Sequence, residues 1–202
     1  MGLGNPGPDY EVSRHNVGFR VVDTLADRVG VALKRCRYRS LFVRGALHGI
    51  QILLVKPLTF MNESGFSVSG WQQALHLEPG RIIVVHDDLD LPPSQLRIRA
   101  GGGHGGHGGV RSIIEAMGSS DFLRVRVGIG RPRDGQDAVK HVLGPFEECE
   151  DDMIQVAIQR AADAVELLLQ EGFEAAMNRY NIRGARQARM AQSGGGEKSE
   201  PV

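Results

Sequence analysis

The sequence predicts an α/β fold, with a single mixed, twisted central β-sheet that is flanked by helices on both faces. Glycines and prolines divide its 202 residues into segments whose apolar positions repeat alternately every two and about every 3.6 residues. The run at residues 82–85 is wholly apolar and suits a strand that is buried on both faces of the sheet. A chain of this length can build one core, so we expect one folded domain.

The remaining strands are marked by short apolar or alternating runs that end at turn residues. Residues 41–47 and 50–55 predict two strands that are joined at His48-Gly49 in a hairpin. Residues 96–98 and 125–129 predict two more strands, and glycines close the second of these.

Apolar stripes at helical spacing predict three longer helices and one short helix. The stripe of the first comprises Val17, Val21, Val22, Leu25 and Val29, opposite Arg20, Asp23, Asp27 and Arg28. The stripe of the second comprises Val68, Trp71, Ala74 and Leu75. The longest helix runs from about Cys149 to Gln170, with a stripe of Met153, Val156, Ala157, Ala161, Ala164, Val165 and Leu168. Residues 173–180 predict the short helix.

The sequence predicts a C-terminal tail outside the folded domain and an incomplete first strand at the N-terminus. We expect residues 1–182 to form the folded domain and residues 183–202 a flexible tail, because the apolar periodicity stops at Ile182. The glycine-rich loop at residues 2–7 would normally follow a strand in this kind of fold, yet only Met1 precedes it. Either the true start lies upstream or a sheet strand is lacking, and we favour the upstream start.

Lysines and arginines balance aspartates and glutamates, so the whole molecule has no general attraction for nucleic acid. Any RNA contact must therefore come from a local cluster. One candidate cluster comprises Arg97, Arg99, Arg111, Arg124, Arg126, Arg131 and Arg133. The alternative is a set of ordinary solvated arginines that are spread over several faces.

Two further features bear on the compartment. The chain has no apolar run of about 18 residues and does not begin with a secretory signal, so we expect no membrane contact and a cytoplasmic location. Cys36 and Cys149 lie far apart without metal-type spacing, and we expect them to be packing residues rather than a disulfide.

Two candidate sites occur near the N-terminus. In the loop at residues 2–7 the glycines expose the Asn5 amide to a ligand, although the motif alone is weak. Arg14-His15-Asn16 places His15 near the start of an apolar helix. There we expect the helix dipole to lower the pKa of His15 and keep it neutral, as a general base requires. The competing interpretation is a structural histidine.

Two further candidate sites lie in the middle of the chain. Residues 60–65 offer the aromatic Phe60 and the amide of Asn62, which could instead be a helix N-cap. Residues 86–92 place carboxylates at the end of the buried strand, where α/β sheets hold their active sites. One of these carboxylates could orient His15 and raise its basicity, or the segment could be a surface turn.

Taken in order, these clusters resemble the peptidyl-tRNA hydrolase family of bacteria and organelles. The resemblance runs from Gly2 to about Asn178. The matching stretches are Gly-Leu-Gly-Asn-Pro-Gly at residues 2–7, Tyr10 with Arg14-His15-Asn16, Phe60-Met61-Asn62-x-Ser64-Gly65, His86-Asp87-Asp88-Leu89-Asp90-Leu91-Pro92, the loop at 101–109, and Arg124-x-Arg126-Val127-Gly128-Ile129-Gly130. The resemblance implies that residues 1–182 are a catalytic domain that cleaves the ester between peptide and tRNA, without metal or cofactor, and so recycles tRNA.

The resemblance also implies roles for individual residues. His15 would be the catalytic base, Asp87 would orient it, and Asn5 would sense the peptide part of the substrate. Asn62 would bind near the scissile ester and stabilise the developing oxyanion. The remaining substrate and tRNA contacts would come from Tyr10, Phe60, Met61, His107 and, at the 5′ phosphate, Arg99 and Arg126. The family default is a monomer with no obligate protein partner.

One position departs from the family pattern. The family usually carries asparagine after the second histidine of the glycine loop, and this chain has Gly108. The loss of that amide predicts a slower enzyme or a shifted role for His107. Two histidines three residues apart, His104 and His107, could also suggest a metal site, but no third ligand is near in sequence.

Two rival interpretations remain at this point. One is a catalytically weak RNA-binding protein on the same fold, similar to plastid splicing factors that resemble these hydrolases. The retained His15, Asp87, Asn5 and Asn62 argue against it. The other is a metal-dependent hydrolase that uses His86, Asp87 and His104.

Overall fold

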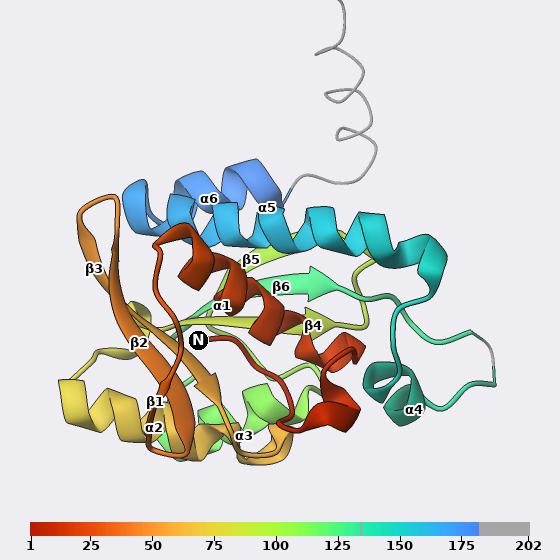
Figure 1. Cartoon of the computed structure of the whole chain (residues 1–202), viewed down its shortest axis with the longest axis horizontal. Helices are drawn as coiled ribbons and strands as arrows, with labels where there is room; N and C mark the ends of the chain where they lie inside the picture. Colours follow the sequence, from red (N-terminus) through yellow and green to blue (C-terminus); the bar gives the residue numbers. More distant parts are fainter. Residues whose placement is uncertain (134, 182–202) are drawn as a thin grey trace, which may run out of the picture.

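The computed structural model describes residues 1–133 and 135–181. The predicted tail at residues 183–202 lies outside these residues. The predicted α/β class is confirmed, and β-sheet and helices form the layers that Figure 1 shows. None of the helices in the described part of the chain combines the length and apolar composition that a membrane crossing requires.

The β-structure consists of two three-stranded sheets rather than one continuous set of strands. The first is antiparallel and contains β1 (Arg35–Arg37), β2 (Ser40–Leu47) and β3 (Ile50–Pro57). The second is mixed and has the order β4 (Ile83–Asp88), β6 (Leu123–Gly128), β5 (Leu96–Ala100), with β4 and β6 parallel and β5 antiparallel to β6.

The extended start of the chain connects the two sheets. The N–H of Gly2 donates to the Val55 carbonyl of β3 at 3.1 Å, and the N–H of Leu3 donates to the Val85 carbonyl of β4 at 2.9 Å. Helix α1 approaches this segment closely, because a Cβ on Gly18 would lie only 2.4 Å from the Val85 carbonyl oxygen. This close packing fixes the start of α1 against β4.

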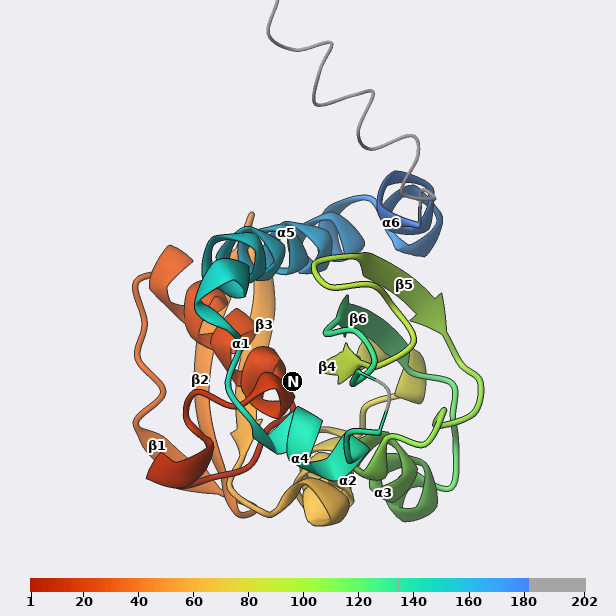
Figure 2. The same ribbon diagram turned by 90° about the vertical axis from the view of Figure 1, so that its right-hand side faces the viewer.

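Helices cover both faces of the structure (Figures 1 and 2). On one side, α1 (Val17–Arg28), α5 (Asp151–Gln170) and α6 (Phe173–Tyr180) pack on the strands, and on the other lie α2 (Ser64–Leu75) and α3 (Gly108–Met117). The short helix α4 (Ala138–Leu143) lies at the edge of the sheet where β4 and β6 end. The 3₁₀ turns are η1 (Pro8–Tyr10), η2 (Arg14–Asn16), η3 (Met61–Glu63), η4 (Pro79–Arg81) and η5 (Glu148–Glu150).

Strand alternation divides the core between these two sides. Val85 of β4 packs with α1 and α5, whereas its neighbour Val84 packs with Leu3, Val110 and Phe122 on the side of α2 and α3. Each such side chain contributes about 1.5–3 kcal/mol when it is fully buried. Both faces of β4 are therefore held firmly, which fixes the residues at its end.

Most of the predicted helices and strands are confirmed. The corrections concern which side chains are buried and three elements that were not predicted. The hairpin turn has left-handed backbone at His48 (φ 49°) and Gly49 (φ 79°), as a two-residue turn requires. On α5, Met153 and Val156 are exposed, because the buried face is centred on Ile154 and Ile158. Ala74, Cys36 and Cys149 were expected to pack in the interior, but all three are exposed. Helices α3 and α4 and strand β1 were not predicted.

Candidate active site

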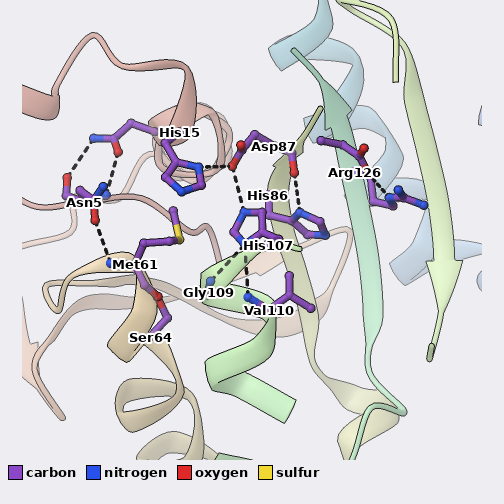
Figure 3. Close-up of polar contacts among 12 residues, drawn as sticks. Asn5, His15, Met61, Ser64, His86, Asp87, His107, Gly109, Val110 and Arg126 are labelled. Atoms are coloured by element: carbon purple, nitrogen blue, oxygen red, sulfur yellow. Dashed lines mark hydrogen bonds and ion pairs between the residues drawn. The ribbon is translucent and has the colours of Figure 1, made fainter. Parts of the chain in front are cut away.

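A cleft of about 520 Å³ opens at the edge where β4 and β6 end, between α4 and the glycine loop before α3. Segments distant in sequence meet there, as Figure 3 shows. The polar residues of this cleft are Asn5, Tyr10, His15, Asn62, His86, Asp87, Asp88, Asp90, Arg99, His104, His107, Arg124 and Arg126. All residues to which the resemblance gave a catalytic or substrate-binding role therefore line one cavity, and α4 adds the apolar side chains Val139, Val142 and Leu143.

His15 and Asp87 form the hydrogen bond that the sequence suggested. His15 Nδ1 lies 2.7 Å from Asp87 Oδ1, and the Asp87 side chain is only 2% exposed. Because the carboxylate is ionised, Nδ1 carries the proton and donates it in this hydrogen bond. The other ring nitrogen, Nε2, therefore keeps its lone pair, and it bonds to no residue that the structure describes. This is the tautomer that a general base needs.

The pKa of His15 moves opposite to the direction expected from the helix dipole and in the direction expected from a neighbouring carboxylate. Burial lowers the pKa of His15, but the charge of Asp87 and its hydrogen bond outweigh this effect, so the pKa is raised above its ordinary value. The helix dipole is not the dominant influence, because a full carboxylate charge lies at hydrogen-bond distance. Burial raises the pKa of Asp87 in turn, but His15 and His107 hold it well below its ordinary value.

His107 is a second donor to Asp87, and its tautomer is fixed by its backbone surroundings. It is the N-cap of α3, where its Nδ1 accepts the N–H groups of Gly109 (3.1 Å) and Val110 (3.2 Å). Since Nδ1 has no proton, Nε2 must carry one, and it donates to Asp87 Oδ1 at 3.0 Å. The sequence suggested a substrate contact for His107, and its position as cap and carboxylate donor was missed.

The same tautomer bears on metal binding. Ligand atoms of His15, Asp87 and His107 lie within 4.8 Å of one another, the only such group among the residues that the structure describes. However, a metal would need the lone pair at His107 Nε2, while Nδ1 already uses its own lone pair for two N–H groups. Coordination would leave the ring without a proton, so this geometry favours hydrogen bonding. His104 is exposed and accepts the Gly106 N–H.

Asn5 is fixed so that its amide nitrogen remains for a ligand. Its Oδ1 accepts the Met61 N–H at 2.7 Å, and its backbone exchanges two hydrogen bonds with the Asn16 side chain, at 2.7 and 3.0 Å. Asn62 is exposed at the cleft, and no side-chain cap occurs at η3 or α2, so the alternative of an Asn62 N-cap is wrong. Tyr10 and Phe60 meet edge to face at 6.5 Å and form an aromatic wall.

The arginines of the predicted cluster differ from one another. Arg99 is exposed beside the cleft, whereas Arg126 pairs with Asp88. Arg124 is buried and donates to the Gly102 and Gly103 carbonyls of the glycine loop. Burial, together with Arg99 and Arg126, lowers the pKa of Arg124 to about 10. Of the more distant members, Arg97 is exposed, and three are paired with acids: Arg111 with Glu115, Arg131 with Asp90, and Arg133 with Glu147.

Comparison with known proteins decides the family. The family model described as peptidyl-tRNA hydrolase matches residues 1–190. The chain belongs to the peptidyl-tRNA hydrolase family. Its relatives include the peptidyl-tRNA hydrolase of Syntrophotalea carbinolica, 43% identical and covering 91% of this chain and 96% of that protein, and that of Syntrophomonas wolfei, 48% identical with 90% and 98% covered.

A solved structure of the same family has the same fold. The crystal structure of peptidyl-tRNA hydrolase from Acinetobacter baumannii matches with a TM-score of 0.85 and 40% identity, covering 90% of this chain and 92% of that one. The resemblance that the motifs indicated is thus confirmed. At the departure from the peptidyl-tRNA hydrolase pattern, Gly108, a Cβ would meet only the Asn62 Cβ at 4.0 Å, so space for a side chain remains.

Proposed function

We propose that this chain hydrolyses the ester bond between peptide and tRNA in peptidyl-tRNA and so returns tRNA to translation. The observation that carries the proposal is the hydrogen bond between His15 and Asp87, which leaves His15 Nε2 as a base in the cleft of a peptidyl-tRNA hydrolase family member. The relatives carry the enzyme's name, and none of them favours a catalytically weak RNA-binding protein.

The proposed reaction uses water as the nucleophile. His15 Nε2 takes a proton from a water molecule, and the water oxygen attacks the ester carbonyl carbon. The Asn62 amide and nearby N–H groups stabilise the negative charge on the tetrahedral oxygen. When the bond to the terminal ribose oxygen breaks, the His15 imidazolium returns the proton to that oxygen. Asp87 stabilises the imidazolium in between.

Substrate selection is assigned to three parts of the cleft. Asn5 presents a fixed amide N–H to the peptide part, which distinguishes peptidyl-tRNA from aminoacyl-tRNA with a free amine. The aromatic wall of Tyr10 and Phe60, together with Met61, receives the acceptor end of the tRNA. Arg99 and Arg126 bind the 5′ phosphate, and this recognition depends on phosphate rather than base sequence. We further propose that the chain acts as a monomer in the cytoplasm, where ribosomes release the substrate.

The test compares wild type with His15→Ala on N-acetyl-aminoacyl-tRNA in the presence of a chelator. General base catalysis contributes about 10²–10⁴-fold, so the variant should lose that factor in kcat while tRNA binding is retained. Aminoacyl-tRNA with a free amine is the control substrate and should react slowly with both proteins. Near-full hydrolysis by the variant would exclude His15 as the base, and inactivity of wild type would reject the proposed function.

A further inference from the structure

His86 is a buried histidine at the cleft end of β4 that the proposed reaction does not use. It follows Val84 on the face of the sheet that α2 and α3 cover, and it is only 4% exposed. Figure 3 shows its ring beside that of His107. The two ring nitrogens of His86 have different surroundings, and these surroundings indicate what the side chain contributes.

The N-terminal segment supplies hydrogen bonds to one row of carbonyl groups on β4. Carbonyls of alternate strand residues point to the same side, and on this side lie residues 1–3. The Met1 nitrogen donates to the Ile83 carbonyl at 2.7 Å, and the Leu3 N–H donates to the Val85 carbonyl at 2.9 Å. The next carbonyl in this row is that of Asp87.

At Asp87 the N-terminal segment no longer follows the strand. The next N–H of the row, that of Asn5, donates to the Asn16 side chain at 2.7 Å. The Asp87 carbonyl accepts instead from the preceding side chain, because His86 Nδ1 lies 2.6 Å from this oxygen. A carbonyl can only accept, so Nδ1 carries the proton and donates it. His86 thus replaces a strand partner at the point where the cleft begins.

The second ring nitrogen of His86, Nε2, has no comparable partner. Since Nδ1 carries the proton, Nε2 holds a lone pair, which is buried and meets no hydrogen-bond donor within residues 1–133 and 135–181. An unpaired buried acceptor lowers stability, so an apolar ring of the same shape would fill this space at lower cost. Burial holds the pKa of His86 well below its ordinary value, so the ring is neutral. What imidazole adds at this position is the Nδ1–H.

The His86 ring also supports the second donor to Asp87. Its ring and that of His107 meet edge to face, with 4.7 Å between the centroids and 71° between the planes. His107 donates its Nε2–H to the Asp87 carboxylate at 3.0 Å. His86 therefore contacts the main chain of Asp87 directly and its side chain through His107.

We propose that His86 is a positioning residue of the reaction, whose Nδ1–H fixes the main chain of Asp87 so that the carboxylate meets His15. This inference rests on the proposed function, since it adds a residue to the same site. Small displacements of a catalytic group are costly in rate, so the loss of this N–H should slow the reaction. The alternative is that His86 only fills space beside His107. The two roles depend on different parts of the ring, and substitution can separate them.

The test uses two substitutions of His86 in the full-length protein. His86→Asn retains an N–H donor near the position of Nδ1 and loses the ring, whereas His86→Phe retains a ring against His107 and loses the N–H. His86→Leu repeats the loss of the N–H with a smaller side chain, should phenylalanine not fit. Steady-state kinetics on N-acetyl-aminoacyl-tRNA, thermal melts and NMR titration of His15 compare each variant with wild type. Ile113→Val is the control for stability alone, because Ile113 is apolar and fully buried on α3.

The N–H and the ring should affect different measurements. His86→Phe and His86→Leu should lower kcat about tenfold, near the upper end of what one neutral hydrogen bond contributes, with KM unchanged. Both should also lower the pKa of His15, because a displaced Asp87 raises it less than in wild type. His86→Asn should keep kcat within about threefold of wild type and leave the pKa of His15 unchanged, although its melting temperature falls with the lost packing. Ile113→Val should lower the melting temperature and leave kcat unchanged.

Two results would overturn the inference. One is a His86→Phe or His86→Leu variant with wild-type kcat and an unchanged pKa of His15. The other is a His86→Asn variant that is as slow as His86→Phe, since the ring rather than the N–H would then matter. If wild type hydrolyses no ester, the proposed function fails, whereas the NMR titration of His15 still shows whether His86 positions Asp87.

Discussion

Asp87 and Asp88 are consecutive residues of β4, yet their carboxylates organise opposite ends of the cleft. Strand alternation turns Asp87 toward His15 and His107, and it turns Asp88 toward Arg126 on β6. At the imidazole end, defined by His15, Asp87 and His107, the carboxylate is shared by two ring N–H groups of fixed tautomer. At the arginine end, defined by Asp88, Arg99 and Arg126, Asp88 neutralises Arg126, whereas Arg99 makes no ion pair within residues 1–133 and 135–181.

In the proposed function, this difference assigns proton transfer to the imidazole end and tRNA binding to the arginine end. At the imidazole end Asp87 is buried and the two histidine side chains are mostly covered, and in each ring one nitrogen carries the proton and the other a lone pair, as proton transfer requires. Under the proposed function, Arg126 at the arginine end exchanges its Asp88 partner for a substrate phosphate when tRNA binds. Changes at the imidazole end should therefore alter kcat and its pH dependence, and changes at the arginine end should alter KM and its salt dependence.

The largest expected effect is that of Asp87→Asn. Loss of the carboxylate removes the charge that stabilises the His15 imidazolium, so kcat should fall about 10²–10⁴-fold, a loss that approaches the one expected for His15→Ala. Since Asp87 raises the pKa of His15, wild-type kcat/KM should rise with pH through an inflection above 6.5, and the variant's inflection should lie lower. Rates over pH 5–9 provide the measurement. An unchanged inflection would show that another group governs the pH dependence.

His107→Asn tests whether Asp87 is shared between two histidines. Asparagine can still cap α3, so the fold should be retained, but the Nε2–H donor to Asp87 is lost. The undivided charge of Asp87 should then raise the pKa of His15 further, and kcat at neutral pH should fall roughly tenfold, as expected for one hydrogen bond to a charged group. NMR titration of His15 gives the direction. A lowered pKa would contradict the shared-carboxylate description.

Sequence reasoning predicted the imidazole end better than the arginine end, for a physical reason. A buried strand that ends in polar residues places them at the sheet edge, so one of these carboxylates could be paired with His15 from the sequence, and the family resemblance selected Asp87. The pair of Asp88 with Arg126 depends on the register of β4 against β6, in which His86 lies opposite Arg126. No local sequence pattern encodes this register.

The missed elements were those with weak local signals. Helix α3 begins with Gly108-Gly109 after a glycine-rich loop, and glycine disfavours helices, so tertiary packing of Val110 and Ile113 overrides propensity there. Helix α4 has only six residues. The dipole argument gave the wrong direction for the pKa of His15 because it considers the helix alone, whereas the deciding charge comes from β4, as the carboxylate hypothesis required.

Asp88→Asn acts on the arginine end. The amide still accepts the Asp90 N–H, which Asp88 Oδ1 now accepts at 2.8 Å, but Arg126 loses its counter-charge. A freed Arg126 should lower KM for peptidyl-tRNA about twofold to fivefold, the range of a partly exposed ion pair, and should steepen the salt dependence with kcat unchanged. Steady-state kinetics at several salt concentrations measure both, and a thermal melt serves as the fold control. A fall in kcat without a change in KM would break the division between the two ends.

The smallest expected effect is that of Gly108→Asn, which restores the side chain usual in this family. The position offers open space beside Asn62 and has no positive φ, so the new amide can enter the cleft without strain. One added hydrogen bond to substrate or water should raise kcat/KM about twofold to threefold, which corresponds to the low end of the net free energy that a hydrogen bond contributes. Gly108→Ala is the matched control, because it likewise removes a glycine from the first turn of α3 but adds no amide. If both variants gain equally, the improvement comes from the start of α3 rather than from a polar contact, and this chain has compensated for its missing asparagine elsewhere in the cleft.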